Sequence, residues 1–253
     1  MPRLVSARAV PDTERVRDRF EGLKDRCGAL EGVELLSAMA AEFPGKLAVA
    51  SSFGATAAVL LDMVARVDPS LPVLLLNTGK LFGETLEYRD ELVGLLGLRD
   101  VRDVRPRPGD LAEADPGGRL WSSDPDRCCF VRKVAPLNRA LMGFDAWATG
   151  RTRDRGSVGP ELDTIEMMDG RVKINPIAGW TQGDIEDYFA ARNLPLHPLV
   201  ADGFLSIGCL PCTDAVSEGE DARAGRWRGF VKTECGIHLG REALQGRRPQ
   251  TNP

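Results

Sequence analysis

The chain has 253 residues, 43% of them hydrophobic, and a formal net charge of −4 at pH 7. This size and apolar content suit one globular unit that needs no disulfide or metal to fold. The acidic balance argues against a surface that coats nucleic acid. No apolar run is long enough to cross a bilayer, and residues 1–20 are charged throughout, without a signal-peptide core. We therefore expect a cytoplasmic protein that binds neither membranes nor nucleic acid.

The first half of the chain alternates between helical and strand patterns. Apolar positions at helical spacing lie within residues 12–43, and Pro44 ends the pattern. Two buried strands follow, each with a helix after it, at 46–54 and 55–67 and then at 71–79 and 84–98. Repetition of strand, loop and helix predicts an α/β fold with a parallel sheet flanked by helices.

The second half continues this pattern before its composition changes. Residues 136–150 predict a helix and a strand, and a short strand at 172–177 precedes a helix whose N-cap we expect at Thr181. Beyond about residue 203 the chain is rich in Gly, Cys, Pro and Arg. We predict an α/β domain over 1–205 and a C-terminal functional segment over 206–253, ending in a mobile tail at 244–253.

Small residues follow the first predicted strand, where it turns into a helix. They are Ser51, Ser52, Gly54 and Ala55. Small side chains let backbone N–H groups approach an anion, and the N-terminus of the next helix adds a favourable dipole. The second strand ends in NTGKLF, residues 77–82, also at a carboxyl end where open α/β sheets bind ligands. The pattern is neither Walker A nor GxGxxG, so a phosphate-binding loop and an ordinary tight turn both fit it.

Arginines gather in two stretches, GRTRDRG at 150–156 and RAGRWRG at 223–229. Guanidinium groups bind phosphate and carboxylate through paired hydrogen bonds. Each stretch is therefore either part of a site for an anionic small molecule or a set of solvated surface charges.

Four of the six cysteines form two pairs, the adjacent Cys128 and Cys129 and the CxxC pair Cys209 and Cys212. A reducing compartment favours metal ligands, nucleophiles or buried apolar groups over disulfides, and a disulfide between adjacent cysteines is strained. Adjacent side chains diverge too far to share one zinc ion easily, whereas an iron–sulfur cluster offers each thiolate its own iron. The residues alone leave three interpretations open: an iron–sulfur cluster, a zinc site, or unrelated cysteines.

Cys235 stands apart in VKTECGIHLG, with Lys232, Glu234 and His238 near it in the sequence. A thiol becomes a competent nucleophile at neutral pH when cations lower its pKa. No cysteine lies beside Cys235 to resolve an intermediate, so sulfur chemistry there needs an external thiol. The alternative is an exposed cysteine in a tail. Cys27 is expected to be an apolar filler within a helix.

In this order, these stretches resemble the assimilatory sulfonucleotide reductases, specifically the adenylyl-sulfate (APS) reductases that carry an iron–sulfur cluster. The resemblance spans about residues 45–240 and rests on SSFGA, NTGKLF, CCFVRKVAPL, TGRTRD, NPIAGWTQGDI, GFLSIGCLPCT, EGEDARAGRW and KTECGIHL. Relatives that use 3'-phosphoadenylyl sulfate (PAPS) typically lack both cysteine pairs and keep the terminal ECG(I/L)H. The cysteines therefore favour APS as the substrate.

The resemblance implies a PP-loop (adenine nucleotide alpha hydrolase-like) α/β fold with a mobile C-terminal catalytic tail. It implies phosphosulfate contacts from Ser51, Ser52, Phe53, Gly54, Arg151, Arg153, Arg223 and Arg226, and adenosine contacts from Asn77, Thr78 and Gly79. It implies a 4Fe-4S cluster on Cys128, Cys129, Cys209 and Cys212, with Lys133 linking cluster and substrate. It also makes Cys235 the nucleophile, with His238 close to it.

The implied reaction is the reduction of APS to sulfite and AMP in assimilatory sulfate reduction. Cys235 would attack the sulfate sulfur and form an S-sulfocysteine, from which thioredoxin or glutaredoxin would release sulfite. Relatives are commonly homo-oligomers, so we expect one here.

Three stretches depart from the family pattern. Asn77 stands where Asp is common, HPLV at 197–200 replaces NPLH, and no further arginine is evident in RGSVGPEL at 155–162. Three alternatives therefore stay open. The first is a PAPS or dual APS/PAPS reductase. The second is a PP-loop iron–sulfur enzyme that thiolates tRNA, which the acidic balance and ECGIH disfavour. The third is a non-enzymatic zinc or redox-sensing module.

Overall fold

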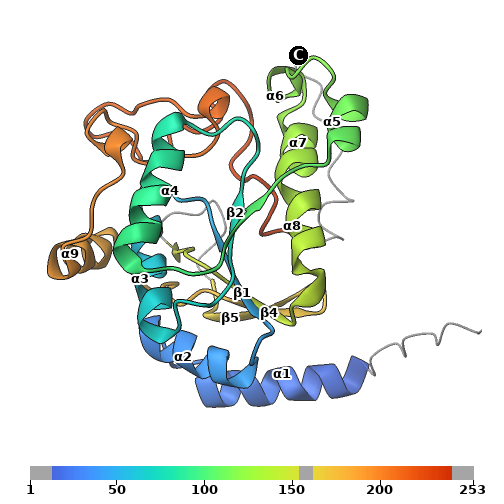
Figure 1. The fold of residues 1–253 in the computed structure, drawn as a ribbon, viewed down its shortest axis with the longest axis vertical. Helices are drawn as coiled ribbons and strands as arrows, with labels where there is room; N and C mark the ends of the chain where they lie inside the picture. The colour runs from blue at the N-terminus through green and yellow to red at the C-terminus, as the bar shows by residue number, and fades with distance from the viewer. Residues whose placement is uncertain (1–12, 154–161, 241–253) are drawn as a thin grey trace, which may run out of the picture.

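A six-stranded sheet forms the centre of the molecule (Figure 1). The computed structural model describes residues 13–153 and 162–240. The strands lie in the order β3-β2-β1-β4-β6-β5, and each neighbouring pair is parallel except β5 and β6. Their bounds are β1 Leu47–Ser51, β2 Val73–Leu76, β3 Val101–Val104, β4 Ala146–Thr149, β5 Ile165–Met168 and β6 Arg171–Ile174. Because β2 lies on one side of β1 and β4 on the other, the carboxyl ends of β1 and β4 form a switch point, where open α/β sheets bind ligands.

Helices cover both faces of the sheet. They are α1 Thr13–Cys27, α2 Gly32–Glu42, α3 Ala57–Val67, α4 Gly83–Leu96, α5 Pro108–Ala114, α6 Leu120–Ser123, α7 Pro125–Cys129, α8 Ala135–Ala140 and α9 Gln182–Arg192. A π-helical turn, Phe130–Val134, joins α7 to α8, and 3-10 turns lie at Leu141–Gly143, Pro198–Val200 and Leu210–Cys212. Figure 1 shows α3 and α4 on one side of the strands and α7 and α8 on the other.

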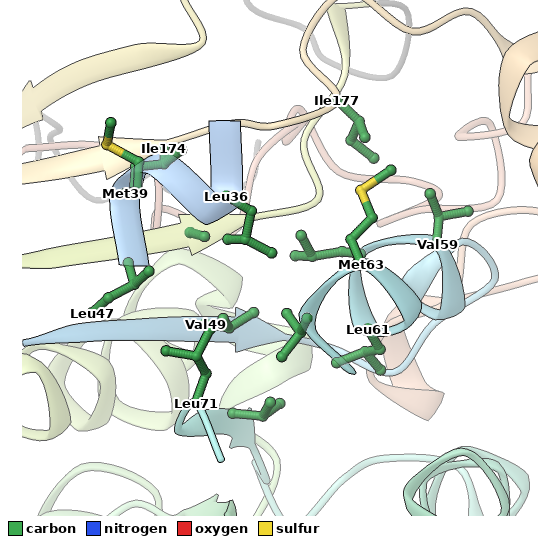
Figure 2. Packing of buried hydrophobic residues seen from close by; sticks show 14 of the residues in the cluster. Leu36, Met39, Leu47, Val49, Val59, Leu61, Met63, Leu71, Ile174 and Ile177 are labelled. Carbon is green, nitrogen blue, oxygen red and sulfur yellow. The ribbon is translucent and has the colours of Figure 1, made fainter. Parts of the chain in front are cut away.

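Alternate strand residues point into two separate apolar layers. In β1, Val49 packs toward α2 and α3, whereas Ala48 packs toward α8. Figure 2 shows Val49 in the first layer, with Leu36 of α2 and Met63 of α3 in the same cluster. Each fully buried Val, Leu or Met contributes about 1.5–3 kcal/mol. The central strands are therefore fixed from both faces, which makes their carboxyl ends a rigid support.

The predicted parallel α/β sheet and its buried strands β1, β2, β4 and β6 are confirmed. The N-cap at Thr181 is also confirmed, because its hydroxyl accepts the N–H of Asp184 at 3.2 Å in a capping box. The helical region within 12–43 is divided into α1 and α2. Residues 28–31 separate the two helices, and α2 begins at Gly32, whose left-handed φ of 54° a continuous helix does not contain. The edge strands β3 and β5 were not predicted.

Residues 206–240 pack onto the sheet and α8. Ile207 contacts the apolar cluster of Phe82 and Leu199, and Ile237 packs against the cluster that includes Trp147. The division of the chain at residue 205 remains a prediction, and the predicted mobile tail lies outside the described residues. None of the helices in residues 13–153 and 162–240 has the length and apolar character needed to cross a membrane.

A buried ion pair connects the segment before α7 to the π turn. Only 2% of the Asp115 side chain and 9% of the Arg132 side chain are exposed. Arg132 donates to Asp115 Oδ2 from Nη2 at 2.6 Å and to the carbonyl of Thr78 from Nη1 at 2.7 Å. Burial alone would raise the pKa of Asp115, but hydrogen bonds from Arg132 and the Leu120 N–H outweigh it and lower the pKa.

We expect Asp115→Asn to lower the free energy of unfolding by about 3 kcal/mol, because it leaves the Arg132 charge buried and unpaired. Urea titration followed by circular dichroism measures this change. Since the pKa of Asp115 is lower in the folded chain, its contribution is present above the unfolded pKa and is lost as the pH falls through the folded value. The matched control is Asp100→Asn, which breaks the exposed pair with Arg102 and should cost less than about 1 kcal/mol. Equal losses in the two variants would contradict this account.

Candidate active site

A cavity of about 240 Å³ opens at the switch point, over the carboxyl ends of β1 and β4. Ser51 and Thr149 end these two neighbouring strands, and both line it. The loop before α3 contributes Ser52, Gly54 and Ala55, so the N-terminal end of α3 borders the cavity. Its dipole and the small side chains beside it favour an anionic ligand.

The charged lining of this cavity is mainly positive. Four of the described residues bring cationic side chains, and one brings a carboxylate; they are Lys133, Arg151, Arg223, Arg226 and Glu234. Such an excess of positive charge, partly shielded from water, attracts anions and holds phosphate or sulfate oxygens.

Arg226 is the most constrained of these cations. Its guanidinium lies over the Trp227 ring, 4.4 Å from the centroid. A Cβ at Gly208 would approach Arg226 Nη2 to 2.3 Å, so only glycine leaves room for the guanidinium there. The Nε of Arg226 is buried without a hydrogen-bond partner in the described part of the chain. A buried donor without a partner is costly, so Arg226 is held in this position by the packing around it.

Cys235 lies on the wall of the same cavity. Its thiol donates to Glu234 Oε1 at 3.3 Å, and the N–H of Gly236 donates to the same oxygen at 3.2 Å. Burial raises the pKa of Cys235 to about 11, while the charge of Lys133 acts to lower it. The resting thiol is therefore protonated at neutral pH, and approach to a cation is what favours its thiolate.

His238 also borders the cavity and stacks on Trp147, with ring centroids 6.3 Å apart and planes 6° apart. Burial lowers the pKa of His238 to about 3, although Glu234 opposes the shift. The imidazole is therefore neutral at pH 7. Its Nδ1 is buried without a hydrogen-bond partner among the described residues.

Lys133 separates this cavity from a second one and lines both. Burial alone would lower the pKa of Lys133, but the sulfurs of Cys209, Cys235 and Cys129 together raise it. The lysine is therefore charged and interacts with the sulfurs on both sides of it.

The second cavity contains the other four cysteines near the active-site region. Cys128, Cys129, Cys209 and Cys212 all line it, together with Trp227. Burial raises the pKa of Cys128 to about 12, and the pKa values of Cys129 and Cys212 are also raised, burial again being the largest cause. Among the described residues, no three His, Cys, Asp or Glu side chains are arranged around a single metal ion. The four thiols nevertheless converge from two distant segments.

Known proteins resemble this chain over most of its length. The profile of the "Phosphoadenosine phosphosulfate reductase domain" matches residues 46–215. The chain belongs to this family. A relative from Mesorhizobium japonicum, named adenosine 5'-phosphosulfate reductase, is 50% identical over 225 residues, which cover 88% of this chain and 89% of that protein. A relative from Gloeobacter violaceus, named phosphoadenosine 5'-phosphosulfate reductase, is 41% identical over 201 residues, covering 78% of this chain and 83% of that protein.

A solved structure of this family has the same fold. The phosphoadenylyl-sulfate reductase from Candida auris, solved as a phosphate complex, superposes with a TM-score of 0.66 at 25% identity, covering 79% of this chain and 97% of that one. The predicted PP-loop type α/β fold is thereby confirmed.

Some residues predicted from the family resemblance are not among those that line the 240 Å³ cavity. Phe53 is fully buried, with a left-handed φ of 49°. The side chain of Asn77 donates to Asp103 at 3.0 Å and accepts from the Gly79 N–H. The Thr78 hydroxyl lies 3.2 Å from the Cys209 sulfur. The Arg153 side chain is exposed and donates to the Leu162 carbonyl. Ligand contacts from Phe53, Asn77, Thr78, Gly79 and Arg153 therefore remain predictions.

Sequence reasoning missed Glu234 and Trp227 as parts of the site. Burial alone would raise the pKa of Glu234, but His238, the Cys235 thiol and Arg151 together lower it to about 2. It is therefore ionised beside the thiol. The ECGIH and GRWRG stretches contained both residues, but only the fold shows that they line the cavity.

Proposed function

We propose that the chain is an adenylyl-sulfate reductase, converting adenosine 5'-phosphosulfate to sulfite and AMP. The observation that carries the proposal is the position of Cys235, a lone thiol on the wall of a cavity whose other charged groups are mostly cations. This pairing of nucleophile and anion site is what transfer from a sulfonucleotide requires. The names of relatives such as that from Mesorhizobium japonicum support APS as the substrate.

In the first step, Cys235 releases its proton to solvent, and its thiolate sulfur attacks the sulfate sulfur. A sulfur–sulfur bond forms, the bond from sulfate sulfur to the bridging oxygen breaks, and AMP leaves with that electron pair. Arg151, Arg223 and Arg226 bind the phosphate, so the charge that develops on it is already compensated. The product on the chain is S-sulfocysteine.

In the second step, a thiolate of an external dithiol protein attacks the Cys235 sulfur and sulfite leaves. The second thiol of that protein then closes its own disulfide and frees Cys235. The dithiol supplies both electrons. Among the described residues, Cys235 is the only cysteine that lines this cavity, which supports thioredoxin or glutaredoxin as the reductant. We also propose a cytoplasmic location and a homo-oligomeric state for the enzyme.

The four converging thiols fit a 4Fe-4S cluster in their chemistry. Sulfur is the ligand that such clusters take, and the two segments present four of them. When bound, the cluster would supply a fixed charge beside Lys133. Cys128, Cys129, Cys209 and Cys212 would hold it, and Lys133 would transmit its field to the sulfonucleotide.

Lys133→Met tests that electrostatic role. We expect the rate of S-sulfocysteine formation to fall about 100-fold, because the substitution removes a cation beside both Cys235 and the leaving phosphate. AMP affinity should change much less. Single-turnover quenching followed by mass spectrometry gives the rate, and calorimetry gives the affinity. An unchanged single-turnover rate would remove Lys133 from the chemistry.

The proposed function is tested by anaerobic purification with iron, sulfide and zinc analysis, followed by incubation with labelled APS without thiol. We expect four irons per chain and a mass increase of one SO3 group, lost on treatment with thioredoxin. Zinc and an inert Cys235 would instead favour the non-enzymatic zinc or redox-sensing module. An RNA-dependent product would favour the tRNA thiolation enzyme.

A PAPS or dual-specificity reductase is the second candidate, because the Gloeobacter violaceus relative is named as a PAPS reductase. The two substrates differ only in the ribose 3'-phosphate. Comparing kcat/KM for APS and PAPS decides between the two candidates.

A further inference from the structure

The segment that carries Cys235 is held by contacts on the residues just before the nucleophile. Lys232 forms an ion pair with Asp126, and the carbonyl of Thr233 accepts from Arg223 Nη2 at 2.8 Å. Glu234 accepts the N–H of Gly236 and so shapes the turn itself. Of these contacts, the ion pair alone reaches the helix that bears Cys128 and Cys129.

The side chain of Lys232 is almost fully buried, which is rare for a lysine. Only 3% of its side chain is exposed, and its ammonium lies 5.4 Å from the centroid of the Trp227 ring. A buried ammonium is costly unless it is paired, and Asp126, on α7, provides the opposite charge. Asp126 comes two residues before Cys128, and Lys232 three before Cys235. One ion pair therefore joins the cysteine-bearing helix to the nucleophile segment.

We propose that Asp126 and Lys232 are positioning residues that hold Cys235 against the cationic cavity and make its position depend on α7. The role assigned to Cys235 rests on the proposed function. Any displacement of α7 moves Asp126 and so acts on the Cys235 segment through Lys232. This gives the cysteine pair on α7 a mechanical connection to the nucleophile.

Two substitutions distinguish an effect on the position of Cys235 from a direct electrostatic effect on its thiol. Lys232→Met removes a positive charge and Asp126→Asn removes a negative one, so their direct electrostatic effects on the Cys235 thiol have opposite signs. Their effects on position are the same, because each breaks the same ion pair. A neutral alkylating reagent, iodoacetamide, reports how accessible Cys235 is.

We expect both variants to increase the alkylation rate of Cys235 about tenfold in the anaerobically purified protein, as judged by peptide mass spectrometry. The plateau of the rate against pH, where the thiol is fully ionised, should rise in both variants, although the two charge changes shift the apparent pKa in opposite directions. Lys232→Arg, which keeps the pair, should react like the wild type. The matched control is Lys24→Met, which breaks the Lys24–Asp163 ion pair far from the site and should also leave the rate unchanged.

Unchanged alkylation in both variants would overturn the proposal. Rates that move in opposite directions would also overturn it, since they would mean that the two residues act on the thiol by charge. Circular dichroism shows whether each variant remains folded, and iron analysis shows whether it retains its iron. If Lys232→Met does not fold, the alkylation rate of Asp126→Asn tests the proposal. Alkylation needs no sulfonucleotide turnover. A wild type that forms no sulfite from APS would therefore refute the proposed function while leaving this comparison intact.

Discussion

Cys235→Ser should abolish sulfite release and leave nucleotide binding intact. A serine hydroxyl keeps the size of the side chain but is a far weaker nucleophile than a thiolate at neutral pH, and it forms no bond that a dithiol can cleave. We expect the turnover rate to fall at least about 10⁴-fold, the scale seen when a nucleophile is removed. AMP should bind as before, because the cations that line the cavity are unchanged.

The measurement combines a sulfite assay, calorimetry with AMP, and intact mass after exposure to labelled APS. The control is Cys27→Ser, since Cys27 is a buried cysteine in the main apolar cluster, away from the cavity. It should lose some stability and keep turnover. Retained turnover in Cys235→Ser, or a persistent SO3 adduct, would contradict the assignment of the nucleophile.

Cys209→Ser is expected to lose iron and activity together. Cys209 is buried and lies 3.2 Å from the Thr78 hydroxyl, so its sulfur is fixed at the junction of the β2 loop and the CxxC segment. A four-thiolate site that lacks one ligand is open to solvent and oxidation. The expected change is the loss of most bound iron and sulfide, with turnover falling in proportion.

Iron and sulfide analysis and visible absorption measure the cluster independently of activity. Cys27→Ser again serves as the control, because it removes a thiol without touching the second cavity. Full iron content in Cys209→Ser would exclude this residue as a ligand. Full activity without iron would separate the cysteine site from the reaction.

The sequence predicted the centre of the sheet better than its edges. β1, β2 and β4 are buried on both faces and therefore appear as continuous apolar runs. β3, with the sequence VRDV, is partly exposed and half charged, so its composition resembles a loop. β5 pairs antiparallel with β6 at the opposite edge and is partly exposed. Pairing with a neighbour, which the sequence does not display, makes both of them strands.

Prediction of the active site was also limited, because the sequence does not show which distant residues become partners. The cysteine pairs, Cys235 and most of the arginines were predicted as site residues, and the fold brings them to the walls of two cavities, while their roles remain predictions. Arg153 and Asn77 have the appropriate chemistry too, but Leu162 and Asp103 engage them. Such partners come from other parts of the chain. Glu234 was noticed only as a neighbour of Cys235, since a single carboxylate gives no signal before its burial is known.

The π-helical turn between α7 and α8 affects the direction, around the helix axis, in which Cys128 and Cys129 point. It contains one more residue per hydrogen-bonded turn than an α-helix, and it lies between Cys129 and α8. Each residue of an α-helix rotates the chain by about 100°. Deleting one residue from Phe130–Val134 would let α8 keep its apolar contacts while swinging both thiols and Asp126 around the helix axis. The wider turn is thus one of the features that determine how α7 presents its thiols to the CxxC segment and Asp126 to Lys232.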